Sequence, residues 1–377
     1  MDITPERRQL VIIGAGIIGL AHAFEAHRRG LRVTVVDREH RATGASVRNF
    51  GHACFSAQPT DLTELAASSR DGWLEAARTT GLTAEQCGTL VVARSELEAE
   101  LLAQLREARG GQRVELLTAS RTRYLLGGLG SPEVVGGAHL PLDVRVDPRT
   151  TVDRLAAWLA GQGVDFLRAT QVGALTSDGS GAVLVTNRGE LRAEQVIIAT
   201  GHDLVHLLPH LAESHQVQRC TLAMHRVATP GQARISPAVL TTTSMLRYGA
   251  FTEQPAADQL RRQVRATRPD LLQAVANVMF TQLPDGSLLV GDTHDYADSP
   301  LPFVPEQRSR LVLDEAAAVL GVDHLDVLER WQGVYANSNR GPLLVAEPLP
   351  GVRVVTVTSG VGMTLSFGLA RQSLDAL

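Results

Sequence analysis

The chain has 377 residues, of which 44% are hydrophobic and 20% charged, and its formal net charge at pH 7 is -4. At about 150 residues per domain, this length predicts two domains with a large buried core. The composition argues against a disordered, collagen-like or coiled-coil chain. The slightly acidic charge balance offers no basic surface for nucleic acid.

All 36 basic residues other than histidine are arginines, because the sequence contains no lysine. This excludes a Schiff-base lysine, a P-loop lysine and a lysine general base. Arginine keeps its proton at physiological pH, so these side chains are suited to binding anions rather than to accepting protons.

Three cysteines, Cys54, Cys87 and Cys220, lie far apart and form no CxxC pair. Neither a disulfide framework nor a zinc knuckle is expected, and the protein should reside in a reducing, cytoplasmic compartment. The apolar run near the N-terminus is interrupted by glycines and by His22 and Glu25, which argues against a signal peptide and a membrane span.

The first predicted unit is a strand, a helix and a second strand, because the hydrophobic period changes from that of a strand to that of a helix and back. These elements cover 10–13, 17–29 and 31–36. A loop of small and polar residues follows over 43–58, and the next helix, capped by Thr60 or Asp61, runs to about Arg78. A second amphipathic helix is expected over 95–109.

Asp147 and Pro148 form a typical helix start, because Asp caps the first turn and Pro fits its first position; this helix should end near Gly161. Strands are expected over 164–170, 182–187 and 191–199, with a hairpin at Arg188–Gly189, and in the strand-rich blocks 217–249 and 278–292. Helices over 256–265, 305–320 and 363–376 and a buried strand over 352–358 complete the chain.

The segment GAGIIG places Gly14, Gly16 and Gly19 between the first strand and helix, and Asp37 ends the next strand. Gly14 permits the tight turn, Gly16 lets a pyrophosphate approach the backbone, and Gly19 lets the helix pack closely on the strand. Asp37 can accept hydrogen bonds from ribose hydroxyls. The complete pattern predicts a dinucleotide site rather than a glycine turn without a ligand.

The fingerprint alone does not distinguish NAD from FAD, but two later segments favour FAD. One is VIIATG, which ends at Gly201, and the other is SGVGMT over 359–364, which lies between a buried strand and the last helix. The second segment presents backbone amides at a helix N-terminus, where they could hold the carbonyl edge of an isoalloxazine ring. A glycine-rich turn with a purely structural role is the alternative.

Together these motifs resemble the FAD-dependent oxidoreductases of the D-amino-acid oxidase and glycine oxidase family. The matching segments occur in family order: VIIGAGIIGL with Asp37, Gly44–Ala45–Ser46, Asp147–Pro148, VIIATG, Trp331–Gln332–Gly333 and SGVGMT. The resemblance implies an α/β protein in which a discontinuous, Rossmann-like FAD-binding domain interleaves with an α+β substrate domain built on an antiparallel sheet. The expected FAD-binding segments are 1–85, 145–215 and 330–377, and the expected substrate-binding segments are 86–144 and 216–329.

The resemblance also implies the chemistry, which is hydride transfer from a C–N carbon to flavin N5 followed by hydrolysis of the imine. Dioxygen or another electron acceptor would reoxidise the flavin. The residues expected to contact FAD come from the fingerprint, the loop after the second strand and the two glycine-containing segments. They are Gly14, Gly16, Ile17, Ile18, Gly19, Asp37, Arg38, Ala45, Ser46, Arg48, Asn49, Gly51, Val172, Thr200, Gly201, Gly360, Val361, Gly362, Met363 and Thr364.

Two loops resemble the branch of the family that is associated with aminophosphonate catabolism: GASVRNFGH over 44–52 and GDTHDY over 291–296. In the family the first loop lies against the flavin, which would bring Arg48, Asn49 and Gly51 near the ring.

The sequence departs from amino-acid-oxidising relatives at Tyr335, where those proteins carry the Arg that clamps the substrate carboxylate. A hydroxyl brings no charge, so other groups must hold the anion. Arg48, Arg340 and His294 are the candidates, and a phosphonate bound by such a cluster is the hypothesis. Tyr248 and Tyr335 complete the expected catalytic set, although each of these residues could instead have a structural role.

No metal site is expected. His202 and His206 have metal-binding spacing, but no third ligand is evident and Pro209 interrupts the helix, which favours a solvated helix face. His52 and Cys54 could link a flavin covalently. The family position of the flavin-linking His is Arg48 here, so non-covalent FAD is the preferred interpretation.

Three functions remain open at this level. The first is oxidation of a small anionic amine, an aminophosphonate such as 2-aminoethylphosphonate or an N-methylated relative. The second is an oxidase or dehydrogenase for glycine, sarcosine or a D-amino acid. The third is a flavoprotein subunit whose FAD is structural or relays electrons to a partner. The sequence leaves open whether the protein forms a homodimer.

Overall fold

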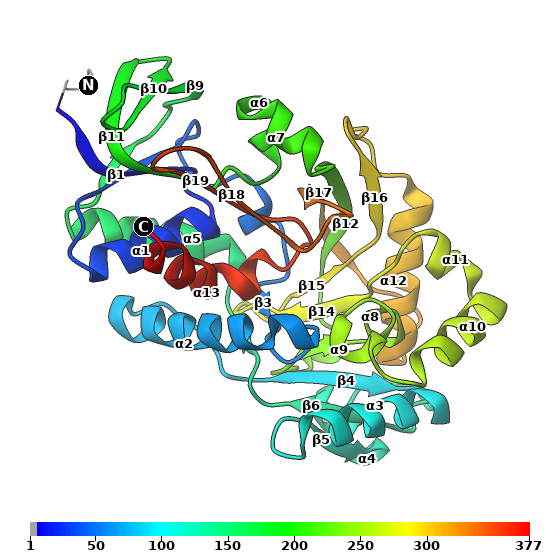
Figure 1. Ribbon diagram of the computed structural model, residues 1–377. Helices are drawn as coiled ribbons and strands as arrows, with labels where there is room; N and C mark the ends of the chain where they lie inside the picture. Colours follow the sequence, from blue (N-terminus) through cyan, green and yellow to red (C-terminus); the bar gives the residue numbers. More distant parts are fainter. Residues whose placement is uncertain (1–5) are drawn as a thin grey trace.

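The computed structural model describes residues 6–377 and contains two large β-sheets, with a two-stranded ribbon between them (Figure 1). The eight-stranded sheet has the order β18-β19-β11-β1-β2-β8, with β10 and β9 added beyond β11. Its strands are β1 (Arg8–Ile13), β2 (Val33–Val36), β8 (Asp165–Leu167), β9 (Val172–Ser177), β10 (Ala182–Thr186), β11 (Gly189–Ile198), β18 (Leu343–Leu349) and β19 (Val352–Val357).

Strand β1 lies at the centre of this sheet and runs parallel to both β2 and β11. Its side chains alternate between two apolar layers, because successive residues of a strand point to opposite faces. Leu10 and Ile12 face the helices α1 (Ile17–Arg28), α2 (Thr63–Thr80), α5 (Pro148–Gly161) and α13 (Gly362–Asp375). Val11 and Ile13 face the layer that contains α6 (Leu204–Leu207) and α7 (Pro209–Ser214).

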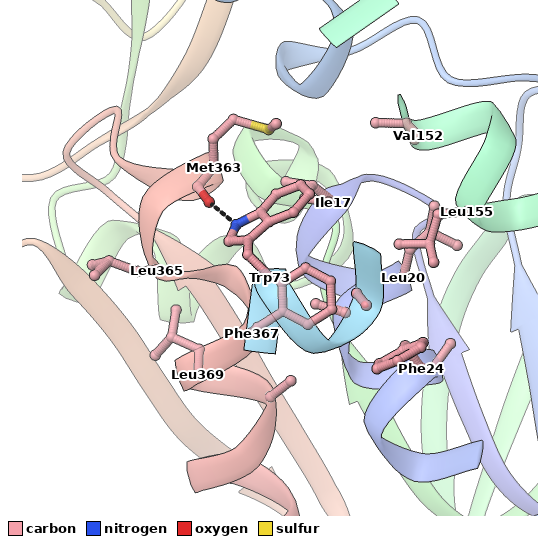
Figure 2. Close-up of a cluster of buried hydrophobic side chains, with 14 of the residues drawn as sticks. Ile17, Leu20, Phe24, Trp73, Val152, Leu155, Met363, Leu365, Phe367 and Leu369 are labelled. Carbon is pink, nitrogen blue, oxygen red and sulfur yellow. Dashed lines mark hydrogen bonds between the residues drawn. The ribbon is translucent and has the colours of Figure 1, made fainter. Parts of the chain in front are cut away.

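The helical layer is shown in Figure 2, where aromatic and aliphatic side chains from all four helices meet. Trp73 is buried at its centre, packs edge-on against Phe367, and donates a 2.7 Å hydrogen bond from Nε1 to the carbonyl of Met363. This bond fixes the first turn of α13, which follows the glycine-rich segment 359–364.

The nine-stranded sheet has the order β16-β12-β15-β14-β13-β4-β6-β5, and β17 pairs with β12. Its strands are β4 (Thr89–Ala93), β5 (Glu115–Thr118), β6 (Gly136–Leu140), β12 (Gln218–Val227), β13 (Ala238–Leu240), β14 (Met279–Gln282), β15 (Leu288–Gly291), β16 (His294–Ala297) and β17 (Val327–Asn337). The helices around it are α3 (Glu96–Arg109), α4 (Ala119–Leu125), α8 (Thr242–Met245), α9 (Gly249–Thr252), α10 (Ala257–Thr267), α11 (Pro269–Gln273) and α12 (Glu306–Leu320). The ribbon joins β3 (His52–Ala53) and β7 (Val144–Arg145).

Most helices begin and end close to the predicted positions. Asp147 caps α5, as its side chain accepts a 2.9 Å hydrogen bond from the Arg149 amide. The start of α2 differs, because Thr60–Leu62 forms a 3-10 turn and the α-helix begins at Thr63, so neither Thr60 nor Asp61 is its cap.

The strand-rich block 217–249 contains β12 and β13, but its last part also forms the short helix 242–245. The segment 331–333 lies inside β17, which pairs with β12 along its whole length. This strand belongs to the nine-stranded sheet, although the last expected FAD-binding segment starts at 330. No helix in residues 6–377 is long and apolar enough to cross a bilayer.

Candidate active site

A single elongated cavity of about 520 Å³ runs from the carboxyl ends of β1 and β2 to the inner surface of the nine-stranded sheet. Its lining includes Gly14 and Asp37 at one end and Arg247 and Asp292 at the other. We refer to these as the nucleotide end and the substrate end.

The nucleotide end is formed by backbone at the start of α1. Gly14 has φ of +107°, and a Cβ there would lie 2.5 Å from the Ala199 carbonyl oxygen. Gly16 is the N-cap of α1 and has no side chain that could cap it. The Ile17 amide donates to Ser46, and the remaining amides of the first turn are available to an anion. Gly19 lies outside the cavity, and a Cβ there would lie 1.9 Å from the Gly14 carbonyl oxygen. The absence of a side chain at Gly19 therefore allows α1 to pack closely on the strand before it.

Asp37 follows β2 and borders the same end. Its two carboxylate oxygens accept hydrogen bonds from the amides of Ala15 at 2.6 Å and Glu39 at 2.8 Å. The next residue, Arg38, forms a 2.8 Å ion pair with Asp203 across the cavity. The Asp37 carboxylate is therefore fixed at the nucleotide end of the cavity, where the ribose of a bound nucleotide would lie beside it.

The loop over 44–52 joins the nucleotide end to the middle of the cavity. Ser46 accepts a 2.9 Å hydrogen bond from the Ile17 amide. Asn49 ties the loop together by donating to the Ala45 carbonyl and accepting from the Gly51 amide. Gly51 lies outside the cavity, and its φ of +70° and close approach to the Val146 carbonyl explain why it lacks a side chain.

The glycine-rich segment before α13 lines the middle of the cavity. The N-cap of α13, Val361, makes no side-chain cap, so the amides of its first turn are available to a ligand. Gly360 has φ of +80°, and a Cβ there would lie 3.0 Å from the Tyr335 ring, so this segment abuts the substrate end.

These features fit an FAD molecule. The N-termini of two helices, neither capped by its own N-cap side chain, border one cavity, with Asp37 at its nucleotide end. Thr200 also lines the cavity, and its buried hydroxyl oxygen has no hydrogen-bond partner in the described part of the chain. A ligand with many acceptors would satisfy these donors. The first turn of α1 would hold the phosphates, and the first turn of α13 would hold the carbonyl edge of the ring.

The substrate end is dominated by Arg247, which follows α8. Its guanidinium donates a 3.0 Å hydrogen bond to the hydroxyl of Tyr335 and a 3.5 Å bond to that of Tyr296. Burial opposes its charge, but Tyr335, Tyr296 and Asp292 outweigh this effect and raise the pKa of Arg247 above its usual value. Arg247 is therefore a permanent cation in the cavity.

Two further titratable groups lie beside this arginine, namely Asp292 and His294. Burial raises the pKa of Asp292 to about 7, against the opposing effects of Arg247 and Asn277. Burial likewise holds the pKa of His294 well below its usual value, helped by the charge of Arg247. His294 Nδ1 donates a 2.8 Å hydrogen bond to the Val275 carbonyl, and the lowered pKa keeps the ring neutral at neutral pH.

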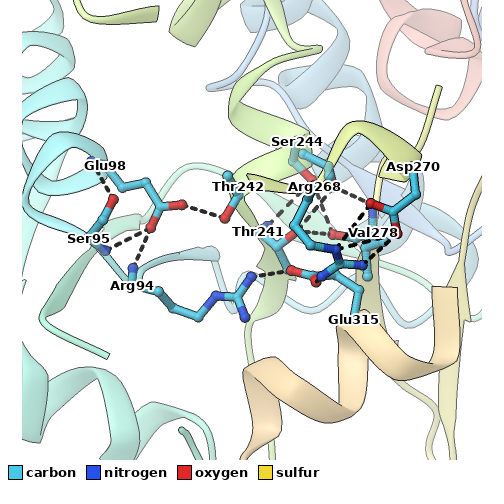
Figure 3. A network of polar contacts seen from close by, with 11 residues as sticks. Arg94, Ser95, Glu98, Thr241, Thr242, Ser244, Arg268, Asp270, Val278 and Glu315 are labelled. Atoms are coloured by element: carbon cyan, nitrogen blue, oxygen red, sulfur yellow. Dashed lines mark hydrogen bonds and ion pairs between the residues drawn. The ribbon is translucent and has the colours of Figure 1, made fainter. Parts of the chain in front are cut away.

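The segment that carries Arg247 is anchored by a polar network (Figure 3). Thr242 donates a hydrogen bond to the buried carboxylate of Glu98, which also caps α3. Thr241 donates to the Val278 carbonyl at 2.6 Å, and Ser244 donates to the Asn277 side chain at 2.8 Å. The network joins α3, α8 and the start of β14, and so fixes the position of Arg247.

Most of the residues predicted from the sequence line this cavity. Of the expected FAD contacts, Gly19 and Gly51 do not line it. Of the expected catalytic residues, Arg48, Tyr248, His294 and Tyr335 line it, whereas Arg340 is exposed on the turn between β17 and β18. Arg48 donates a 3.1 Å hydrogen bond to the Gln332 carbonyl and so joins the loop over 44–52 to β17.

The prediction of a solvated helix face for His202 and His206 holds for His206, which is exposed on α6, with its Nε2 2.7 Å from Arg219. His202 is half-buried, and both side chains also border the cavity. His52, Cys54 and Asp143 form a buried cluster whose ligand atoms lie within 4.8 Å of one another. Burial, then the charge of Asp143, raises the pKa of the Cys54 thiol well above its usual value, which disfavours the thiolate needed for metal binding or covalent linkage.

Sequence reasoning missed Arg247, Asp292 and Asn277. Arg247 lies next to the candidate Tyr248, but in a block expected to be rich in strand. Asp292 belongs to the GDTHDY loop, in which His294 is the candidate. One sequence feature could have identified Asp292: it is an acidic residue that directly follows a buried apolar strand.

With this geometry established, comparison with known proteins gives the class of the chain. Residues 9–375 match the DAO family, described as FAD dependent oxidoreductase. The chain belongs to this family, and FAD is its cofactor.

Curated relatives include glycerol 3-phosphate oxidase of Mycoplasma pneumoniae, 26% identical over 61% of this chain and 63% of that protein. Glycine oxidase of Geobacillus kaustophilus is 31% identical over 52% of this chain and 55% of that protein. The matches thus span less than two thirds of these relatives. Among solved structures, glycine oxidase from Bacillus cereus ATCC 14579 superposes with a TM-score of 0.79 at 20% identity, covering 98% of this chain and 94% of that one.

Proposed function

We propose that the protein uses FAD to oxidise a C–N bond of a small amine that also carries an anionic group. The observation that carries this proposal is the half-buried guanidinium of Arg247, in the same cavity as the nucleotide end. A fixed cation in a buried pocket binds an anion strongly, because little water competes with it.

An aminophosphonate, such as 2-aminoethylphosphonate or an N-methylated relative, is the substrate class we favour. The family's carboxylate-clamping arginine is replaced by Tyr335, and the charge comes instead from Arg247 on a different segment. Moving the cation changes where the anion sits relative to the reacting carbon. A phosphonate, which is larger than a carboxylate and has three oxygens, suits a pocket in which Arg247 lies beside the Tyr335 hydroxyl.

When bound, FAD accepts the hydride that leaves the substrate carbon. The chain's own residues position the substrate and exclude water. Arg247 holds the anionic end, while the first turn of α13 supplies amides that stabilise negative charge at the neighbouring ring edge. Dioxygen is the proposed electron acceptor, with a quinone or a carrier protein as the alternative.

Glycine, sarcosine or a D-amino acid is the second candidate substrate class. The observation in its favour is the similarity to glycine oxidases in sequence and fold. Arg247 could bind a carboxylate as well as a phosphonate, since both are anions that accept paired hydrogen bonds. The third reading, a flavoprotein that oxidises no amine, leaves the half-buried cation of the substrate end without a role.

The test is anaerobic reduction of the purified flavoprotein, followed by loss of the visible flavin absorbance. The protein is mixed separately with 2-aminoethylphosphonate, its N-methyl derivative, glycine, sarcosine and D-alanine. We expect rapid bleaching by the phosphonates. Faster bleaching by a carboxylate would replace the phosphonate with the second class, and no bleaching by any amine would reject amine oxidation.

A further inference from the structure

Asp292 is a buried carboxylate that faces the cavity with one oxygen free. It follows the last residue of β15, is 3% exposed, and lines the substrate end. Its backbone is fixed by two hydrogen bonds to Asn277, at 3.0 Å from its amide and 2.9 Å to its carbonyl. Its Oδ1 has no hydrogen-bond partner within residues 6–377.

A buried carboxylate oxygen without a hydrogen-bond donor destabilises the protein, because it has lost its water and gained no partner. The nearest candidate partner, His294 Nδ1, lies 3.7 Å from Oδ1 but donates to the Val275 carbonyl at 2.8 Å instead. The histidine is thus already engaged. A ligand that brings an N–H donor would satisfy the free oxygen.

Arg247 and Asp292 carry opposite charges in one cavity, yet no ion pair joins them in the part of the chain that the structure describes. Arg247 is instead held by tyrosine hydroxyls. Two opposite charges that lie near each other without direct contact suit a ligand that has both an anionic and a cationic group.

We propose that Asp292 binds the ammonium group of the substrate and accepts a proton from it. This inference rests on the proposed function, which supplies an amine as the ligand. In the proton transfer, an N–H bond of the ammonium breaks, its electron pair stays on the nitrogen, and the proton forms a bond to Oδ1 of Asp292. The resulting neutral amine has the lone pair that hydride loss from the adjacent carbon requires.

The surroundings of Asp292 suit a group that exchanges a proton near neutral pH. Burial raises its pKa to about 7, while Arg247 and the Asn277 side chain prevent a larger rise. The other titratable groups that interact with it are His294, which is neutral, Tyr248 and Cys220. Burial raises the pKa of Tyr248, and it raises that of Cys220 to about 12, so neither is charged at neutral pH.

The experiment compares ligands that differ only in the amine. Calorimetry on the FAD-loaded protein under anaerobic conditions measures affinities for 2-aminoethylphosphonate against ethylphosphonate, and for glycine against acetate. We expect the amine to improve affinity about tenfold or more in the wild type, and Asp292→Asn to abolish this preference while leaving affinity for the amine-free ligand unchanged. Asp295→Asn is the matched control, because Asp295 is three residues away, exposed, and paired with Arg308.

A preference for the amine that survives in Asp292→Asn overturns the proposal, whether or not the amine reduces the flavin. A preference that depends on Asp292 without flavin reduction supports Asp292 and rejects amine oxidation. If Asp292→Asn loses its FAD, the wild type alone decides: the affinity ratio of amine to amine-free ligand should rise with pH as Asp292 loses its proton around pH 7. A ratio that stays flat from pH 6 to 8 overturns the proposal.

Discussion

The nucleotide end and the substrate end of the cavity are built from different groups. At the nucleotide end the chain presents backbone amides, and the residues that matter are glycines whose Cβ would collide with a neighbouring carbonyl. At the substrate end it presents a half-buried charged side chain, Arg247, bonded to a buried phenolic one, Tyr335. The first end therefore tolerates no added bulk, whereas the second is sensitive to lost charge and lost hydrogen bonds.

Ligand binding and folding are coupled at the nucleotide end but separable at the substrate end. The turn around Gly14 joins β1, at the centre of the eight-stranded sheet, to α1. The backbone conformation that would bind the nucleotide is therefore also required for the sheet and helix to pack. Arg247 lies on a short segment outside the strands, held by a local network. Changes at the nucleotide end should therefore affect stability and FAD binding together, while changes at the substrate end should affect catalysis alone.

The largest effect is expected for Gly14→Ala. The new Cβ would meet the Ala199 carbonyl oxygen at 2.5 Å, at a residue with φ of +107°. We expect a loss of about 2–4 kcal/mol in the free energy of unfolding, and loss of bound FAD. Urea denaturation and the flavin absorbance measure the two effects.

Gly30→Ala is the matched control for this change. Gly30 also has a positive φ, +77°, but a Cβ there would meet nothing within 4 Å. It should therefore lose only about 1 kcal/mol and keep its FAD. Equal losses in both variants would show that backbone strain, rather than the close approach at the nucleotide end, is what matters.

His22, on α1 beneath the nucleotide end, should make stability depend on pH. Burial lowers its pKa from 6.5 to about 4, with the charge of Arg353 adding to this and a hydrogen bond to the Ile18 carbonyl opposing it. The unfolded chain therefore takes up the proton first as the pH falls. The stabilisation is complete above pH 6.5 and is lost towards pH 4, by about 3 kcal/mol.

The measurement is the free energy of unfolding between pH 7 and pH 4 for the wild type, His22→Leu and His210→Gln. Leucine removes the titrating group, so the curve for His22→Leu should be flatter. The side chain of His210 is 98% exposed, and its variant should follow the wild type. Parallel curves for all three proteins would rule out His22 as the source of the pH dependence.

At the substrate end, Arg247→Gln should lower kcat/KM roughly 30- to 100-fold, mainly through KM, because it removes the half-buried charge that holds the anion. FAD content should stay unchanged, which would separate this end from the nucleotide end. Arg262→Gln, an exposed arginine on α10, is the control and should behave as the wild type. An unchanged KM in Arg247→Gln would remove the central support for an anionic substrate.

The same contrast explains what could be predicted from the sequence. The nucleotide end consists of short contiguous motifs, and the glycine spacing together with Asp37 specifies a local strand–turn–helix geometry. The segment 359–364 is equally local. These features, the α/β class and most helices could therefore be predicted.

The substrate end could not be read in the same way, because its groups come from segments that the fold alone brings together. Arg247 reaches Tyr335 across 88 positions of sequence, and no spacing rule connects them. Arg340 looked suitable because it follows Tyr335 closely, but the chain reverses between β17 and β18 and leaves it exposed. A long-range hydrogen bond of this kind depends on tertiary packing, which the local sequence does not specify.

The smallest effect is expected for Tyr335→Phe, which keeps the ring against Gly360 and removes only the hydroxyl. That hydroxyl accepts the 3.0 Å hydrogen bond from Arg247. Its loss should free the guanidinium to move and raise KM roughly tenfold, corresponding to about 1–1.5 kcal/mol for one hydrogen bond. Steady-state kinetics give KM, and the flavin spectrum should not change, because the ring still packs on the segment before α13. A decrease in FAD content would instead mean that the hydroxyl supports the cofactor, and that the two ends of the cavity are less independent than their construction suggests.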